Sequence, residues 1–244
     1  TKIGKVVGWN VDEFMKGEKK TYTIIIGDKE KGKLTEKELK DFFDNNKVSI
    51  SINGILYKTD KVGLIPALLK DWFEKRREYR KLANKFADEK DYDRYDYFNK
   101  RQYLQKVLLN SLYGVLGLPV FRLYDVDNAE ATTLTGQSLL KFTRKMTNHY
   151  YNNNLETEDK NYCIYGDTDS VFYSALPLVR KRFPHINFKD EKILIDKCID
   201  VAGEIQDFLN KSYDFFAENF LNVKNHRFEI KQELVAKSLS LIHI

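Results

Sequence analysis

Two long stretches without helix-breaking residues limit what this chain can fold into. Residues 66–86 begin with Pro66, contain no glycine and no further proline, and place apolar side chains three and four positions apart. A second periodic stretch covers 97–116 and ends near Gly114 and Gly117. Proline suits the first turn of a helix and glycine often follows its last turn. The pattern predicts two long helices that follow one another and pack as an antiparallel pair.

The remaining segments mix the two types of secondary structure. Segments rich in β-branched and aromatic residues predict a strand over 21–26, a hairpin over 48–58 with a two-residue turn at Asn53 and Gly54, a hairpin over 161–174 and a strand over 226–234. Helical spacing predicts helices over 34–43, which has a capping box formed by Thr35 and Glu38, over 129–151 and over 190–221. The predicted class is α+β, with sheet and helices in one layer system and the helical pair projecting from it.

Composition excludes several classes of protein. With 42% hydrophobic and 14% aromatic residues, the chain has the groups that a folded core requires, unlike a disordered chain. The apolar runs are much shorter than the roughly 20 residues of a membrane span. The 2 cysteines lie outside any CxxC pattern, so neither a zinc site nor a disulfide framework is indicated.

An acidic tip joins the two strands predicted over 161–174. Asp167 and Asp169 flank Thr168, and residues two apart on an extended strand point to the same side. Two convergent carboxylates suit Mg²⁺, which prefers hard oxygen ligands and usually takes one or two carboxylates from the protein. An ordinary turn is the alternative, because aspartate and glycine favour turns for conformational reasons alone.

A polar stripe runs along the second long helix. Lys106, Asn110 and Tyr113 are spaced i, i+4 and i+7, and Tyr103 precedes them by one turn. Lysine binds phosphate as a compact charge, and Gly114 leaves room for a planar group to approach the backbone. The stripe therefore predicts contact with a phosphate and with a sugar or base.

Two arginines on the first long helix extend this cationic character. Arg76 and Arg80 are spaced i and i+4, so they can converge on one anion. Residues 65–106 carry 12 Lys or Arg and 8 Asp or Glu, which accounts for most of the formal net charge of +5. A solvated charged face is the alternative for such a segment.

In combination, these motifs resemble those of a known family. KVLLNSLYG at 106–114 followed by YGDTDS at 165–170 resembles motifs B and C of family B DNA polymerases. The chain also resembles the palm and fingers of the T4-like phage replicative enzymes, through RLYDVDNAEATTLTGQ at 122–137 and NGILYKTDKVGLIPALLKDWFEKRREYRK at 53–81. The resemblance covers most of 1–238 and implies a palm segment at 1–63, a fingers hairpin at 64–117 and a further palm segment at 118–238.

The resemblance also implies roles for individual residues. Asp169 would be a metal ligand and Asp167 its acidic neighbour, with two Mg²⁺ ions as cofactors and Glu233 as an acidic position near the metal site. Lys106, Arg76 and Arg80 would hold the triphosphate of an incoming dNTP. Asn110 would help form that pocket, and Tyr113 and Gly114 would lie under the nascent base pair. We therefore expect Asp169 and the stripe that begins at Lys106 to face a common cavity.

The implied reaction is phosphoryl transfer, in which the 3′-hydroxyl of a primer attacks the α-phosphate of the dNTP. Primer–template DNA, the dNTP and a sliding clamp are the implied partners, and the cytoplasm of a phage-infected bacterium is the implied location.

The chain departs from the family pattern in one important respect. Motif A, DxxSLYPS, supplies the other metal-binding aspartate and has no match here. The exonuclease domain, the KKRY segment and the thumb are not matched either, so we expect a fragment truncated at both ends that does not polymerise alone.

The last six residues, LSLIHI at 239–244, correspond to one translation of a transposon adapter used in shotgun sequencing. We interpret them as a library scar, with a genuine apolar tail as the alternative.

Three other interpretations remain open at this point. One is a different palm enzyme, either protein-primed or cellular. A protein-primed enzyme should carry a domain-sized insertion between motifs A and B, and residues 1–105 contain none. Another is a noncatalytic nucleic-acid-binding module, supported by basic helices and many tyrosines that could stack on bases. A subunit of a naturally split polymerase is the third.

Overall fold

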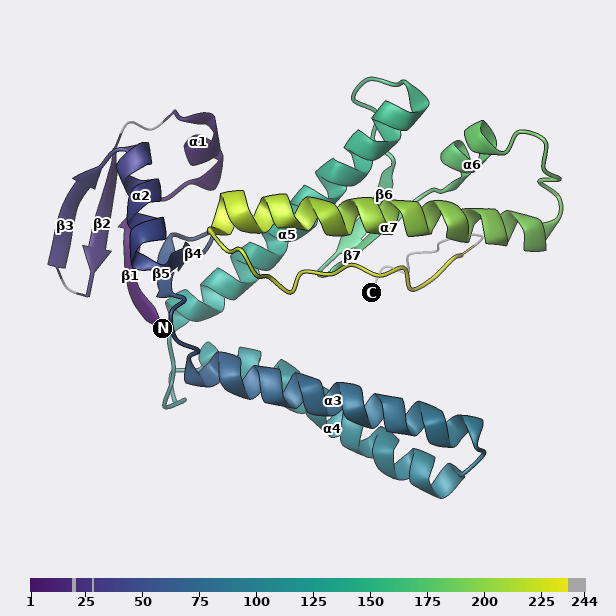
Figure 1. Cartoon of the computed structure of the whole chain (residues 1–244), viewed down its shortest axis with the longest axis horizontal. Coiled ribbons are helices and arrows are strands. Elements are labelled where there is room, and N and C mark those ends of the chain that lie inside the picture. The colour runs from purple at the N-terminus through teal and green to yellow at the C-terminus, as the bar shows by residue number, and fades with distance from the viewer. Residues whose placement is uncertain (19–20, 28, 237–244) are drawn as a thin grey trace. The chain divides into compact units, whose positions relative to one another are not determined.

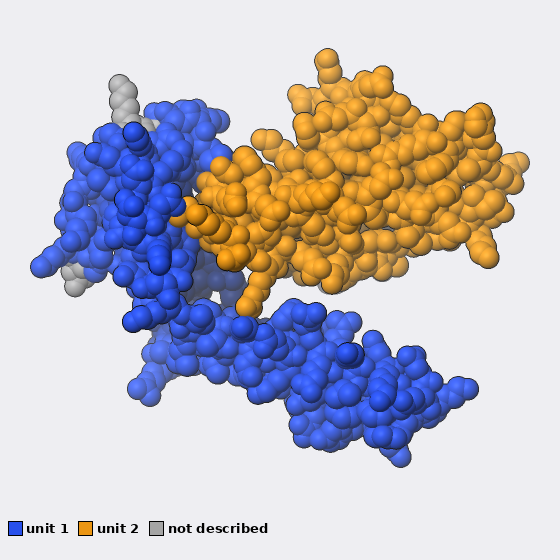
Figure 2. All heavy atoms as spheres, in the orientation of Figure 1, with its two compact units in different colours: residues 1–133 blue, residues 134–244 orange. Residues whose placement is uncertain are grey.

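The computed structural model describes residues 1–18, 21–27 and 29–236. Its chain divides into two compact units, Thr1–Thr133 and Leu134–Ile244, which Figure 2 shows in blue and orange. The interpretation of 239–244 as an adapter scar lies outside the described residues. Each unit is described by itself below.

The first unit begins with a five-stranded antiparallel sheet (Figure 1). Its strands are β1 (Lys2–Val7), β2 (Tyr22–Ile26), β3 (Lys29–Leu34), β4 (Val48–Ile50) and β5 (Ile55–Lys58), in the spatial order β3-β2-β1-β5-β4. The short helix α1 (Val11–Lys16) follows β1, and α2 (Glu36–Asn46) connects β3 to β4. The strand predicted over 21–26 and the helix predicted over 34–43 are both confirmed.

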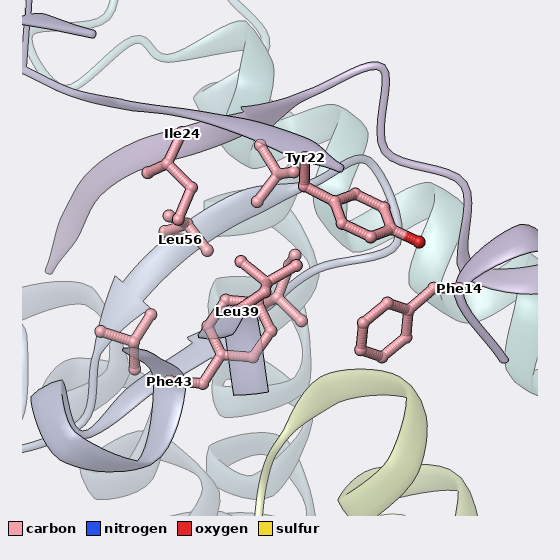
Figure 3. Packing of buried hydrophobic residues seen from close by; sticks show 9 residues of the cluster. Phe14, Tyr22, Ile24, Leu39, Phe43 and Leu56 are labelled. Atoms are coloured by element: carbon pink, nitrogen blue, oxygen red, sulfur yellow. The ribbon is translucent and has the colours of Figure 1, made fainter. Parts of the chain in front are cut away.

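The hydrophobic core of this sheet is tightly enclosed. Tyr22, Ile24, Leu39 and Leu56 have no exposed surface, and Figure 3 shows side chains from strands and from α2 packed together with Phe14. The capping box of α2 is present, because the Thr35 hydroxyl accepts from the Glu38 amide while the Glu38 carboxylate accepts from the Thr35 amide. The local sequence therefore fixes where α2 begins.

The hairpin over 48–58 is confirmed, but its turn differs from the two-residue turn predicted. The Gly54 amide donates to the Ser51 carbonyl, and the Ser51 amide donates to the Ile55 carbonyl, so three residues lie between the paired positions. Gly54 has φ 82°, and a Cβ there would lie 2.6 Å from the Cβ of Trp9. The prediction failed because a glycine in the left-handed region also suits a three-residue hairpin loop with a bulge.

Helices α3 (Leu64–Asp88) and α4 (Tyr92–Leu116) run side by side as the predicted antiparallel pair (Figure 1). Helix α4 begins five residues before the predicted start at Tyr97. The Asp91 carboxylate accepts from the Arg94 amide, which is the contact of an N-cap. The charged, tyrosine-rich segment therefore belongs to the helix and not to the connection.

A polar cluster joins the sheet to the start of α5 (Val126–Leu155) within the first unit. The ammonium group of Lys2 donates to Asp125 at 2.9 Å and to Asp127 at 2.6 Å. Tyr57 donates to the side chain of Asn128 at 2.8 Å, and burial, reinforced by Asp125, raises the pKa of Tyr57 to about 12. These contacts fix the start of α5 against β1 and β5.

The second unit contains the rest of α5, a two-stranded sheet and two further helices. The strands are β6 (Cys163–Asp167) and β7 (Ser170–Tyr173), and the helices are α6 (Leu176–Arg182) and α7 (Glu191–Leu221). Tyr151 on α5 is fully buried, and its ring stacks on that of Tyr162 with centroids 4.7 Å apart. The second hairpin and the helices predicted over 129–151 and 190–221 are confirmed, and the strands form two sheets instead of one layer system.

The strand predicted over 226–234 is wrong. This segment is extended but pairs with no other strand of the described chain, and side chains of α7 hold its backbone instead. Asn210 donates to the Ile230 carbonyl and accepts from the Ile230 amide, and Gln206 accepts from the Gln232 amide. The alternating pattern was present, but a strand also needs a neighbouring strand.

Within the described part of the chain, none of the helices has the length and apolar character that crossing a membrane requires.

Candidate nucleotide and metal site

The seam between α3 and α4 follows a heptad pattern. The less exposed positions of α3 include 65, 69, 72, 76, 79, 83 and 86, and those of α4 include 95, 98, 102, 105, 109, 112 and 116. Alternating steps of three and four are typical of the contact stripe between two packed helices. Antiparallel alignment then forms seven layers: Ile65–Leu116, Leu69–Leu112, Trp72–Leu109, Arg76–Gln105, Tyr79–Gln102, Ala83–Phe98 and Phe86–Tyr95. The ring centroid of Phe98 lies 5.5 Å from that of Phe86 and 6.2 Å from that of Tyr79, which agrees with its place in the layer between them, opposite Ala83.

Arg76 lies in this seam, whereas Arg80 is exposed one turn further along α3. The Nε of Arg76 is buried and has no hydrogen-bond partner among the described residues. In the same register, Lys106 is next to Gln105, the residue opposite Arg76. The register therefore brings Arg76 and Lys106 to the same level of the helical pair.

The two sides of the seam carry different cations. The guanidinium groups of Arg94 and Arg101 lie over the rings of Phe86 and Tyr79, at 4.3 Å and 5.8 Å from the centroids, and so mark one side. Helical geometry places Arg80 and Lys106 on the other side, because each lies on the opposite flank of its own helix. In this register, Arg80 and Lys106 lie on the same side of the seam layer that contains Arg76.

Ion pairs with carboxylates of the same helix or its cap neutralise some of the cations of the helical pair: Lys70–Glu74, Lys75–Asp71, Lys85–Glu89, Arg94–Asp91 and Lys100–Asp96. Within the described chain, Arg76, Arg80 and Lys106 form no ion pair, and the same holds for Arg77, Lys81, Lys90 and Arg101. The charge of Arg76, Arg80 and Lys106 is therefore available to an anion, and their place beside one layer of the seam distinguishes them from the other unpaired cations.

The end of α4 carries the other residues of the predicted stripe. Asn110 is exposed, Tyr113 is 45% exposed, and the Tyr113 hydroxyl forms a hydrogen bond with the Thr133 hydroxyl of α5. A Cβ at Gly114 would meet no described atom within 4 Å, so the space beside Tyr113 is open. The sequence analysis did not single out Thr133, although it lies in the segment 122–137 that resembles the palm.

The acidic tip has a different local geometry from the one predicted. Asp167 is the last residue of β6 and pairs with Ser170, while Thr168 and Asp169 form the turn. Thr168 has φ 45° and its hydroxyl donates to Asp167 at 2.9 Å. The argument from alternation along a strand was therefore wrong, because Asp169 is not on an extended strand.

The donor chemistry of the tip still suits magnesium. Asp167 and Asp169 are exposed carboxylates, and within the described chain neither forms an ion pair, so no cation competes for their oxygens. No group of three or more His, Cys, Asp or Glu able to hold a metal is present among the described residues. Glu233, which is also exposed, therefore forms no such group with the two aspartates. The tip offers two of the hard oxygen ligands that Mg²⁺ prefers.

The cationic residues and the acidic residues belong to different units. Arg76, Arg80 and Lys106 lie in Thr1–Thr133, and Asp167, Asp169 and Glu233 lie in Leu134–Ile244. The common cavity expected for Lys106 and Asp169 therefore stays a prediction.

Comparison with known proteins identifies the family. Residues 20–179 match the model of DNA polymerase family B. The chain is similar to the DNA-directed DNA polymerase of Escherichia phage RB69, with 34% identity over 133 residues that make up 54% of this chain and 14% of that protein. It is similar to the enzyme of the same name from Enterobacteria phage T4, with 37% identity over 123 residues, or 46% of this chain and 14% of that protein.

A relative outside the bacteriophages covers more of the chain. The DNA polymerase of Phaeocystis pouchetii virus is 35% identical over 180 residues, which make up 71% of this chain and 16% of that protein. The chain thus spans about one seventh of the length of these relatives. Because the family model matches well over half of the chain, this protein belongs to DNA polymerase family B, with similarity to the T4-like phage enzymes.

Proposed function

We propose that this chain is the part of a template-dependent DNA polymerase that holds the incoming dNTP and contributes acidic ligands to the metal site. The proposal is supported by the heptad register, in which Arg76, Arg80 and Lys106 fall beside the same part of the α3–α4 seam, and by the lack of an ion pair at each of them within the described chain. A triphosphate is the anion that would match three such cations. The match to DNA polymerase family B supports DNA synthesis as the setting.

The side chains of α3 and α4 bind and orient the nucleotide in this proposal. Arg76, Arg80 and Lys106 neutralise the triphosphate as the 3′-hydroxyl of a primer attacks the α-phosphate. Asn110 helps form the pocket, and Tyr113 and Gly114 lie under the new base pair, where the open space beside Gly114 admits a planar base. The α3–α4 pair is then the fingers, which close over a correct pair.

The acidic tip provides the other part of the reaction centre. Asp169 and Asp167 would hold two Mg²⁺ ions together with an aspartate from a segment outside the matched region, and Glu233 would lie nearby. Bound magnesium supplies stabilisation of the charge on the attacking and leaving oxygens. The partners are primer–template DNA, the dNTP, the remaining segments of the polymerase and a sliding clamp, and the setting is the cytoplasm of a phage-infected bacterium.

The test replaces the metal ligand in a complete polymerase that contains this sequence. Asp169→Asn should abolish primer extension and leave duplex binding nearly intact. The matched control is Asp159→Asn, since Asp159 is an exposed aspartate of the same unit with φ 47°, a conformation that asparagine also adopts. An unchanged extension rate in Asp169→Asn would show that the ligand assignment is wrong.

The chain of 244 residues by itself should not extend a primer, because it has no match to motif A, which supplies the other metal-binding aspartate. Measurable extension that requires both template and Mg²⁺, by the purified chain, would refute this part of the proposal.

A further inference from the structure

The layer formed by Arg76 and Gln105 differs from its neighbours in the seam. The layers on one side of it are apolar, from Trp72–Leu109 to Ile65–Leu116. In the adjacent layer on the other side, Gln102 is satisfied, because its amide donates to Asn99 at 3.0 Å. A charged side chain in such a stripe is unfavourable unless its polar atoms are paired.

Two buried polar atoms in this layer lack partners. Among the described residues, neither Nε of Arg76 nor Oε1 of Gln105 has a hydrogen-bond partner, and both atoms are buried. One is a donor and the other is an acceptor. Because the heptad register places the two residues in one layer, a hydrogen bond between these atoms would satisfy both.

We propose that Gln105 is a positioning residue for Arg76, with its Oε1 accepting the Nε–H of Arg76 across the α3–α4 seam. The guanidinium group is planar and its five N–H groups form a rigid fork, so fixing Nε–H also fixes the direction of the two terminal nitrogens. Those nitrogens then extend from the seam toward the side of Arg80 and Lys106, where they meet the triphosphate. This inference rests on the proposed function of that side as the nucleotide site.

The inference assigns the polar layer a role other than stability. A leucine at position 105 would extend the apolar stripe of α4, in which Leu109 and Leu112 already occupy seam positions. A purely structural account therefore expects Gln105→Leu to leave thermal stability unchanged or raised, with no effect on anion binding. If Gln105 positions Arg76, Gln105→Leu should weaken anion binding even though its thermal stability is unchanged or raised.

The first experiment observes the hydrogen bond directly in the chain of 244 residues. In a ¹⁵N-labelled sample at pH 6, the Nε–H signal of Arg76 is assigned by its loss in Arg76→Lys. We expect slow exchange of this proton with water in the wild type and in Gln105→Glu, which retains an acceptor, and fast exchange in Gln105→Leu. Equally fast exchange in the wild type and in Gln105→Leu would overturn the inference.

The second experiment measures binding of inorganic tripolyphosphate by calorimetry. Gln105→Leu should weaken binding by about 3- to 10-fold, the loss expected when one charge-assisted contact is no longer oriented. The matched control is Gln102→Leu, one layer along the seam and opposite Tyr79, which should leave the affinity unchanged. Equal affinities of the wild type and Gln105→Leu would overturn the positioning role.

The two experiments separate this inference from the function on which it rests. Suppose that the wild type bound no tripolyphosphate, but that its Arg76 Nε–H exchanged slowly and Gln105→Leu made this exchange fast. The proposed nucleotide site would then fail, and the hydrogen bond between Arg76 and Gln105 would stand. If tripolyphosphate bound with equal affinity to the wild type and Gln105→Leu, the nucleotide site would stand and the positioning role would fail.

Discussion

The sheet with α2 and the α3–α4 pair, both in the first unit, differ in how completely they enclose their apolar side chains. In the sheet, Tyr22, Ile24, Leu39 and Leu56 are fully buried between the strands and α2. Of the residues of α3 and α4, all of which are described, only Ala83, Phe86 and Leu116 are buried. Two paired helices bury only one stripe of side chains on each helix, whereas a helix packed on a sheet buries a layer of side chains between them.

In the proposed function, this difference separates stability from binding. The sheet and α2 provide an enclosed core. The helical pair has a thinner apolar seam, but it can present cations along a surface that α3 and α4 share. A region that closes over a nucleotide needs such accessible side chains and gains little from a thick core.

The two tryptophans of the chain allow the two regions to be followed separately. Trp9 packs against the core of the sheet, and Trp72 lies in the third layer of the α3–α4 seam. In the variant Trp72→Phe, the fluorescence of Trp9 therefore follows unfolding of the sheet. In Trp9→Phe, the fluorescence of Trp72 follows unfolding of the helical pair. Each prediction below uses fluorescence in these two backgrounds.

The largest expected effect compares two leucines. Leu56→Ala should lower the free energy of unfolding of the sheet by about 3 kcal/mol, because the side chain is fully buried and its loss leaves a cavity. Leu109→Ala should cost the helical pair only about 1 kcal/mol, because Leu109 is half-buried and its side chain removes less apolar surface from water. Urea titration measures both, and equal losses would contradict the comparison.

The next effect compares two glycines. Gly54→Ala should destabilise the sheet by about 2 kcal/mol, because Gly54 has φ 82° and a Cβ there would lie 2.8 Å from the Val6 carbonyl. Gly114→Ala should stabilise the helical pair by about 0.5 kcal/mol, because it removes a glycine from α4 where no described atom lies within 4 Å. The same urea titrations apply. A destabilising Gly114→Ala would mean that the space beside Tyr113 is already filled.

The smallest effect concerns acid. The amide and hydroxyl of Thr35 hold the pKa of Glu38 below its usual value, and the amide and guanidinium of Arg94 do the same for Asp91. A carboxylate with a lowered pKa contributes stability above its ordinary pKa and loses that contribution as the pH falls through the lowered value. Both regions should therefore weaken slightly below about pH 4.

Two variants assign this acid dependence to its source. Glu38→Gln keeps a capping side chain without a charge, so it should reduce the acid dependence reported by Trp9 and leave that reported by Trp72 unchanged. Asp91→Asn should do the reverse, since asparagine also caps helices well. Thermal unfolding between pH 3 and pH 7 measures both, and identical profiles in all variants would show that neither cap contributes.

Most elements of the fold were predictable, because their signals are local. The capping box at Thr35, Pro66 in the first turn of α3 and the apolar periodicity of both long helices each act within a few residues. The missed details have local causes as well: the early start of α4 depends on Asp91 as N-cap, and the three-residue turn depends on Gly54 adopting a positive φ.

The candidate site was predictable as a set of residues but not as an arrangement. The spacing of Lys106, Asn110 and Tyr113 predicted a stripe on one helix, and YGDTDS predicted an acidic tip. That Arg76 lies in a seam opposite Gln105 follows only from the pairing of two helices. The available sequence signal was the recurrence of apolar residues in steps of three and four along both helices, such as Ile65, Leu69 and Trp72 in α3.

The helices, the two hairpins, the membership of DNA polymerase family B and the residues expected to touch a nucleotide follow from the amino-acid sequence alone, because periodicity, caps and motif spacing are encoded within short segments. The folded chain was needed to see that residues 226–234 lie against α7 without a partner strand among the described residues, that Asp169 belongs to a turn, and that Arg76 and Gln105 carry buried polar atoms without partners. Each of these depends on which groups from distant parts of the chain are available to satisfy a buried polar atom or a backbone amide, and no short segment carries that information.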